Sequence, residues 1–443
     1  HNGYISAALC GPDGRFEDPP QLILTFPAPY EGVLPGVTIT WSPAYGEWAV
    51  EYRVLAYQGE RILFSQTETN SGLTSVLAGD ISGYDRLVVE VLAWSQPQPR
   101  ARAEGLFLGV EKVYGKSQIM EFSASMSVNP LSAELPKSEV RFSILNLDGE
   151  YNPDNPQGMS KYLMERQEIT VRYGYKLEGA VEWIPGGTYY LSEWDNPQNG
   201  ITATFTARDG LEFLTEPYGG PQSGTLYDIA SAAFRQADLA PLPDGSPRWL
   251  VDESLRSIPA PDLKEELSKE SLAVVLQYAA NAACCVFYQD RTGRIRIEPL
   301  NAQLEDYSID RFVSYANAEL TLTKPLRSVD VNNGQFVFTA GRKGEVQSLS
   351  NPLLTEEQAP AAARWTADYL QNRRVLSGSY RADPRLDPLD LVRLENQFAQ
   401  SIVLITNVEY TYNGAFRGSY TSRGMMTAMA QYYYAGDLYA GEV

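Results

Sequence analysis

The sequence predicts a mainly β, multidomain protein with an N-terminal β-sandwich, two β-barrel-like domains and a small α+β domain. The chain has 443 residues. A single hydrophobic core stops growing at about 250–300 residues, so we expect roughly three or four domains. Most apolar residues lie in strand-length runs separated by Gly, Pro, Asn and Asp. Apolar residues at helical spacing occur only in short stretches of the second half.

The first part of the chain is interpreted as a lead-in segment followed by the sandwich. Residues 1–25 are rich in Gly, Pro, Asp and Asn and show little periodicity. From residue 26 to residue 114, apolar runs alternate with Gly- and Ser-rich breaks, which is typical of a β-sandwich. The expected strands are GVTITW (36–41), WAVEYRVLAY (48–57), RILFSQTET (61–69) and DRLVVEVLAW (85–94).

Residues 115–216 and 315–425 are strand-dominated blocks of similar length, which favours two copies of one barrel-like design. Residues 426–443 have weak periodicity and are interpreted as a C-terminal tail. The expected strands of the first block are QIMEFSASMSV, SEVRFSIL, QEITVRYGY, GTYYLSEW and ITATFTARD.

The second of these blocks also contains a predicted helix within residues 358–374. Pro360 suits its first turn. Further along, two acidic residues flank Pro388, and we expect them to turn the chain into a strand. The side chains expected on one face of the helix are Trp365, Tyr369 and Leu370, and the two acidic residues are Asp387 and Asp390.

Residues 217–314 are predicted to form the α+β domain. A helix is expected in 223–239 with Ser223 as its N-cap, and a second in 268–283 with Ser268 as its N-cap. A hairpin should follow, with its turn at residues 290–293. The apolar positions expected to face inward are Leu226, Ile229, Ala230, Ala233 and Phe234 in the first helix, and Leu272, Val275, Leu276 and Ala279 in the second.

The composition excludes several classes of function. Lys and Arg total 36 against 55 Asp and Glu, and the net charge of −19 at pH 7 disfavours binding to phosphate backbones. The apolar stretches are shorter than the roughly 18 uninterrupted residues of a membrane span, and no signal-peptide pattern opens the chain. We therefore expect a soluble protein with no nucleic-acid partner, no membrane span and no export signal.

Side chains for catalysis and metal binding are scarce. The single histidine, His1, begins the chain, which excludes histidine-dependent triads and zinc sites. The cysteines are Cys10, Cys284 and Cys285, whose spacing fits neither a disulfide framework nor a zinc site. The adjacent pair should pack as small hydrophobic residues. No catalytic residue, metal or cofactor is predicted.

The stretch NLDGEYNPDNPQG (146–158) places carboxylates, asparagines and prolines between two expected strands. A calcium loop, a catalytic carboxylate pair and a turn would all use such residues. An EF-hand loop starting at Asp148 needs a glutamate at its twelfth position, where this chain has Met159. A glycosidase acid needs a setting that raises its pKa, and this polar stretch offers none. A structural turn is therefore favoured.

Residues 123–175, SASMSVNPLSAELPKSEVRFSILNLDGEYNPDNPQGMSKYLMERQEITVRYGY, resemble tail-hub and tail-tip proteins of bacteriophages and prophages. The pattern is a strand ending in Asn, an acidic turn with Asn-Pro, a Tyr-Leu segment and a strand ending in Gly. Two further stretches agree, LAVVLQYAANAACCVFYQDRTGRIRIEPL (272–300) and NPLLTEEQAPAAARWTADYL (351–370). The resemblance implies a ring-forming homo-oligomer, commonly a trimer, that assembles with other phage tail proteins in the virion tail.

The sandwich, residues 26–114, resembles a discoidin or galactose-binding-like module through VTITWSPAYGEWAVEYRVLAY and DRLVVEVLAWSQPQPRARAEGLFLGV. Such modules often bind sugars with aromatic and arginine side chains of their loops. For the tryptophans, core packing is preferred over stacking on a glycan because they flank strands. The candidate glycan-binding residues that the resemblance implies are Tyr45, Trp48, Trp94, Arg100 and Arg102.

These observations predict a non-enzymatic structural component of a phage or prophage tail, located at the baseplate hub or the tail tip. One alternative is a carbohydrate-binding adhesin that contacts a host surface glycan through the sandwich. A tail-associated peptidoglycan hydrolase is a more distant alternative, because the chain shows no added domain of that kind.

Overall fold

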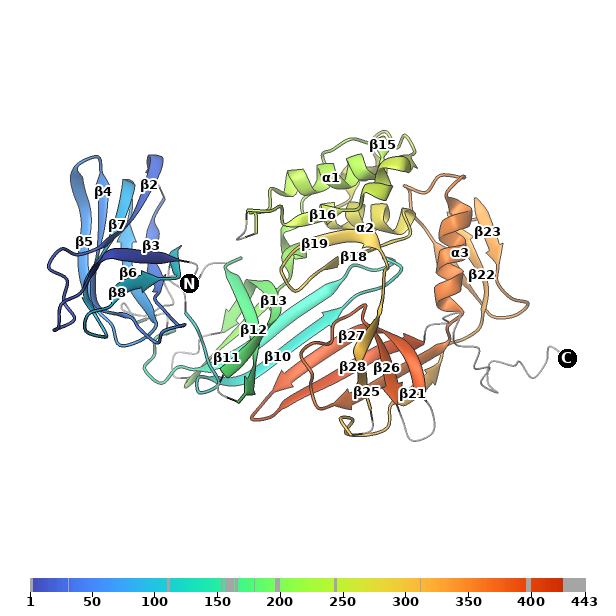
Figure 1. Cartoon of the computed structure of the whole chain (residues 1–443). Helices are drawn as coiled ribbons and strands as arrows, with labels where there is room; N and C mark the ends of the chain where they lie inside the picture. Colours follow the sequence, from blue (N-terminus) through green and yellow to red (C-terminus); the bar gives the residue numbers. More distant parts are fainter. Residues whose placement is uncertain are drawn as a thin grey trace. The chain divides into compact units, whose positions relative to one another are not determined.

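The structure, a computed structural model, forms two compact units, His1–Gly115 and Lys116–Val443 (Figure 1). Within the described residues, no helix is long and apolar enough to cross a membrane. The predicted C-terminal tail, 426–443, lies outside the described residues. The structure describes residues 3–30, 32–109, 112–152, 154–155, 163, 166–178, 180–195, 200–242, 245–310, 312–395 and 400–424.

The first unit is built from a four-stranded sheet of order β2-β7-β4-β5, a three-stranded sheet of order β6-β3-β9 and the pair β1-β8. Alternating side chains of the two larger sheets meet in one core, as in a sandwich. The strands are β1 (Tyr4–Leu9), β2 (Gln21–Tyr30), β3 (Leu34–Thr40), β4 (Ala49–Gln58), β5 (Arg61–Thr69), β6 (Thr74–Ile81), β7 (Tyr84–Trp94), β8 (Arg100–Ala103) and β9 (Gly105–Leu108).

The segment predicted as a lead-in is part of this fold. Residues 4–9 form β1, and Cys10 and Phe16 are buried in the sandwich core. Its Gly, Pro and Asp residues form turns between core contacts, which hides any periodicity. At the centre of the core, Trp41 makes an edge-to-face contact with Trp94 at 5.9 Å between ring centroids.

The second unit contains a large sheet of eleven strands, with the main order β12-β13-β14-β11-β10-β27-β28-β25-β21. Its branch strand β26 pairs with β27 and β20. The strands are β10 (Ile119–Ser127), β11 (Lys137–Leu145), β12 (Glu168–Leu177), β13 (Ala180–Asp195), β14 (Thr202–Arg208), β20 (Leu304–Ile309), β21 (Glu319–Leu322), β25 (Arg374–Tyr380), β26 (Leu391–Glu395), β27 (Gln400–Tyr412) and β28 (Phe416–Gly424).

The mainly β, multidomain prediction is confirmed, but no sheet in the described part of the chain closes into a barrel. The strands of the two predicted barrels instead join edge to edge through β10 and β27, where Ala124 pairs with Tyr410. Strand β27 is long enough to pair with β26 over its first half and with β10 over its second half. One long strand therefore connects two blocks that looked separate in the sequence.

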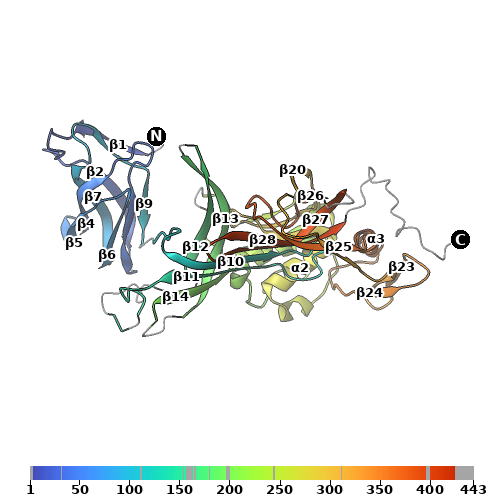
Figure 2. The same ribbon diagram turned by 90° about the horizontal axis from the view of Figure 1, so that it is seen from below.

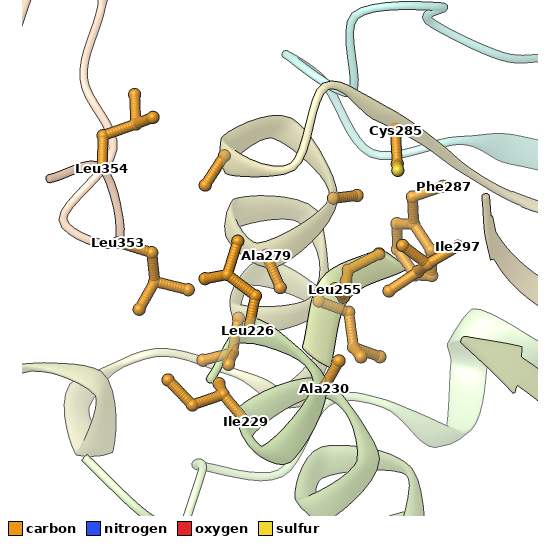
Figure 3. Close-up of a cluster of buried hydrophobic side chains, with 14 of the residues drawn as sticks. Leu226, Ile229, Ala230, Leu255, Ala279, Cys285, Phe287, Ile297, Leu353 and Leu354 are labelled. Carbon is orange, nitrogen blue, oxygen red and sulfur yellow. The ribbon is translucent and has the colours of Figure 1, made fainter. Parts of the chain in front are cut away.

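The remaining elements of the second unit share another core, and we call this part the α-containing body (Figure 3). Its core residues lie between Leu214 and Ala367. Figures 1 and 2 show it on one face of the large sheet. Its elements are α1 (Leu226–Ala237), α2 (Leu272–Ala282), α3 (Ala359–Leu370), β15 (Gly224–Thr225), β16 (Trp249–Val251), β17 (Pro259–Ala260), β18 (Cys285–Gln289), β19 (Ile295–Pro299), β22 (Leu326–Val331), β23 (Phe336–Thr339), β24 (Glu345–Leu349) and the 3-10 turns Gly210–Phe213, Glu253–Ser257 and Glu266–Lys269.

The helices follow their predicted faces, but their caps differ. Every apolar position expected to face inward in α1 and α2 is buried. The N-cap of α1 is Thr225, which forms a capping box with Asp228, and that of α2 is Ser271. Ser223 and Ser268 lie too far before the first helical residue to accept its N–H groups. In α3, the buried face consists mainly of alanines, whereas Trp365 is only half-buried.

Candidate functional site

The predicted sandwich residues form a small cluster around Glu47, a residue that the sequence did not single out. Arg102 Nη1 donates to Glu47 Oε2 at 2.9 Å, and Trp94 Nε1 donates to the same oxygen at 3.0 Å. The Arg102 guanidinium carbon lies 4.3 Å from the centre of the Tyr45 ring, and Tyr45 is 58% exposed. The cluster thus presents one exposed aromatic ring braced by a paired arginine.

The other predicted residues of the sandwich have different surroundings. Trp94 is 3% exposed and belongs to the core, so its ring faces protein on both sides. Trp48 is half-buried against the same core. Arg100 Nη1 donates to the carbonyl oxygens of Ser6 and Ala7, at 2.8 and 2.9 Å. The structure therefore brings together Tyr45, Arg102 and Trp94, and it places Arg100 on strand β1.

One edge of the large sheet is the β12–β13 hairpin, which carries exposed apolar side chains at its far end. Tyr175 and Trp183 are each 61% exposed, and Leu177 and Val181 are nearly half exposed. Trp183 packs over Gly174, where an added Cβ would lie 2.9 Å from the indole ring. Exposed large apolar side chains on a free strand edge are typical of a protein–protein contact.

Other free edges of the sheet are at β21 and β20. Strand β21 pairs only with β25, and β20 pairs only with β26, within the described residues. Leu320 and Leu322 of β21 are 49% and 56% exposed. The backbone groups on the outer side of each edge strand are available to a further strand.

A pocket of about 920 Å³ lies between the large sheet and the α-containing body. Its apolar lining includes Tyr189, Val286 and Leu389. Acidic groups outnumber basic ones among its charged lining residues, which are Asp252, Asp290, Arg291, Glu298, Asp387 and Asp390. The predicted turn at Pro388 is present, since Asp387 N–H donates to Asp390 Oδ2 at 2.8 Å.

Two buried aspartates lie at this interface. Burial raises the pKa of Asp209 to about 7, although its carboxylate accepts backbone N–H groups from Ser138 and Leu211. Burial also raises the pKa of Asp387 to about 6, against the opposing effect of the Arg291 guanidinium. Sequence reasoning did not identify Asp209, because nothing local marks the residue after a strand as buried.

The stretch 146–158 forms a turn as far as the structure describes it. Asp148 Oδ1 accepts the Glu150 N–H at 3.2 Å, and Asn146 Oδ1 accepts the Tyr151 N–H at 3.0 Å. The buried ring of Tyr151 packs edge-to-face on Phe205, which anchors the turn to the sheet. In the part of the chain described, no group of three or more His, Cys, Asp or Glu side chains is arranged to hold a metal ion.

Comparison with solved structures finds phage and prophage tail proteins. This chain is similar to a prophage tail protein from Shewanella oneidensis, with 12% identity and a TM-score of 0.46 over 72% of this chain and 94% of that chain. A tail protein from Neisseria meningitidis gives 10% identity and a TM-score of 0.46 over 69% and 92% of the two chains. A prophage tail protein from Listeria monocytogenes gives 10% and 0.44 over 72% and 91%. No protein-family model and no curated protein matches the chain.

Proposed function

We propose that this protein is a non-enzymatic structural component of a phage or prophage tail, at the baseplate hub or the tail tip. The observation that carries the proposal is the large sheet with free edges, one of which presents Tyr175, Leu177, Val181 and Trp183 to solvent. The sequence pattern at 123–175 supports it independently. The partners would be other tail proteins and further copies of this chain, in a trimeric ring.

The assembly would bury the apolar hairpin and pair the free strands. Burial of apolar surface supplies about 25 cal/mol per Å², so four large side chains can contribute several kcal/mol to an interface. Closed symmetry would use up every free edge and stop the chain from adding copies without limit.

Sedimentation velocity over a concentration series, with negative-stain imaging of the largest species, tests this proposal. The wild type should form a discrete oligomer with ring-shaped particles, and Trp183→Ser with Tyr175→Ser should shift it towards monomer. Val337→Ser is the matched control, because Val337 is 51% exposed on β23, a strand outside the large sheet. A wild type that stays monomeric throughout, or a control that dissociates the oligomer equally, would contradict the proposal.

A second candidate function is binding of a host surface glycan by the sandwich. The favouring observation is the exposed Tyr45 ring, held by Arg102 and Glu47 in a fixed orientation. An aromatic face of this kind can stack on a sugar ring. A glycan array should show binding that Tyr45→Ala abolishes and that Tyr57→Ala, on another strand of the sandwich, preserves. Absence of wild-type binding to any glycan would reject this candidate.

A further inference from the structure

The large sheet and the α-containing body have separate hydrophobic cores. The core of the sheet includes Ala124, Val140 and Val408, and that of the body includes Leu226 and Phe287. No residue belongs to both cores. The two parts therefore do not depend on one continuous apolar interior, and the contacts between them determine how firmly they dock.

Those contacts are largely polar. We call the interface the seam and define it by Ser132, Thr188, Asp209, Gln289, Arg291 and Asp387. Gln289 Oε1 accepts the Gly210 N–H at 2.7 Å, and Gln289 Nε2 donates to the Thr188 carbonyl at 2.8 Å. Ser132 Oγ donates to the Cys285 carbonyl and accepts the Phe287 N–H, both at 2.9 Å. The pocket of about 920 Å³ lies in this interface, so much of the seam is not closely packed.

The chain crosses the seam at Asp209. Strand β14 of the large sheet ends at Arg208, and the first turn of the α-containing body begins at Gly210. Asp209 Oδ2 accepts the Ser138 N–H of the sheet at 2.8 Å, and Asp209 Oδ1 accepts the Leu211 N–H of the body at 3.1 Å. One carboxylate thus joins the two parts where the chain passes between them.

Asp387 holds another part of the seam. Arg291, in the turn between β18 and β19, donates from Nε to Asp387 Oδ2. The same guanidinium donates to the carbonyl oxygens of Pro384 and Arg385, each at 2.6 Å. Both seam aspartates are therefore placed where movement of the body would return them to water.

We propose that the α-containing body docks on the large sheet through a proton-sensitive seam, in which Asp209 and Asp387 bind protons in the docked position and release them when the body moves away. The inference does not depend on the proposed function, since it concerns two parts of one unit.

The sign follows from burial. The pKa of Asp209 is raised to about 7 and that of Asp387 to about 6 when docked, and an exposed aspartate titrates near 4. Docking is thus strongest below about pH 4 and weakens as the pH rises through 6 and 7. The neighbouring groups that act on these carboxyls are Glu212 and Tyr189 at Asp209, and Arg291, Asp290, Asp390, Tyr173, Tyr189 and Tyr410 at Asp387.

Hydrogen exchange of the β18–β19 hairpin in the full-length protein tests this inference at pH 5 and pH 8, after correction for intrinsic exchange rates. Each aspartate changes the docking equilibrium by roughly tenfold to a hundredfold over this range, so wild-type protection should fall by at least about tenfold. The amides of β4 and β7 in the first unit serve as the internal reference.

Asp387→Asn and Asp209→Asn should each reduce this pH dependence, and the double variant should remove it. Glu121→Gln, an exposed carboxylate on β10, is the matched control and should behave as the wild type. If Asp209→Asn does not fold, Asp387→Asn alone must still remove about a tenfold change. Equal wild-type protection at both pH values, or an unchanged dependence in Asp387→Asn, would overturn the inference.

Discussion

Arg291 Nε donates to Asp387 Oδ2 and so joins the β18–β19 turn to the loop before β26. The guanidinium also donates to the carbonyl oxygen of Pro185, at 3.2 Å, within β13. A single side chain therefore contacts both strand-dominated blocks from the α-containing body between them. The exposed fractions of the Arg291 and Asp387 side chains are 19% and 27%, so this ion pair is largely shielded from solvent.

Replacing Arg291 should destabilise the second unit. Arg291→Ala leaves the Asp387 carboxylate without its cation, and breaking such a buried pair costs about 3 kcal/mol. Chemical denaturation should show this loss in the transition of the second unit. Arg385→Ala removes a half-exposed arginine paired with Asp383 and should cost less than about 1 kcal/mol. Similar losses in the two variants would contradict the assigned role of Arg291.

The N-cap of α1 distinguishes the structure from the sequence-based prediction. Thr225 Oγ1 accepts the Asp228 N–H at 3.1 Å, and Asp228 Oδ2 accepts the Thr225 N–H at 3.0 Å. Thr225→Ala should therefore lower the free energy of unfolding by about 1 kcal/mol. Ser223→Ala, two residues earlier and exposed, should change it by less than about 0.5 kcal/mol. Thermal denaturation of both variants checks the order, and a larger effect at Ser223 would refute it.

The cysteine thiols should be unreactive in the native protein. Burial raises the pKa of Cys284 to about 11 and that of Cys285 to about 12, and it also raises the pKa of the buried Cys10. Because the thiolate is the reactive form, a thiol reagent at pH 8 should label almost none of them within minutes. The same reagent in denaturant should label all three cysteines. Rapid labelling of the native protein would show that the helix-to-strand junction is open.

Glu47 should be important for the stability of the sandwich. Its carboxylate accepts from both Arg102 and the buried indole N–H of Trp94. Glu47→Ala leaves that N–H without an acceptor, at an expected loss of about 2 kcal/mol. Glu104→Ala, at an exposed position beside β8, provides the comparison and should have little effect. Denaturation followed by tryptophan fluorescence measures both, and an unchanged midpoint for Glu47→Ala would disprove the role.

Local sequence determined the type and position of most elements. Leu226, Ile229 and Phe234 are spaced for one helical face, and all three are fully buried. The same holds for the hairpin that turns at residues 290–293, where Gly293 adopts φ of +82°. Such features depend on neighbours in the chain, because side-chain periodicity fixes which face of an element is apolar.

The candidate site on the sandwich was only partly predictable. The loop aromatics and arginines pointed to the right region, since Tyr45 and Arg102 do meet. The burial of Trp94 and the central position of Glu47 could not be known, because both depend on how loops from separate strands pack.

The sequence by itself determined that this protein is mainly β, with helices in the second half of the chain and a turn at 146–158. Only the tertiary structure decided that β10 pairs with β27, which makes one large sheet of two predicted barrels. It also decided that Asp387, predicted as a simple turn residue, is paired with Arg291. These relations join residues far apart in the chain, and local periodicity cannot specify which free strand edge or buried charge a distant residue will meet.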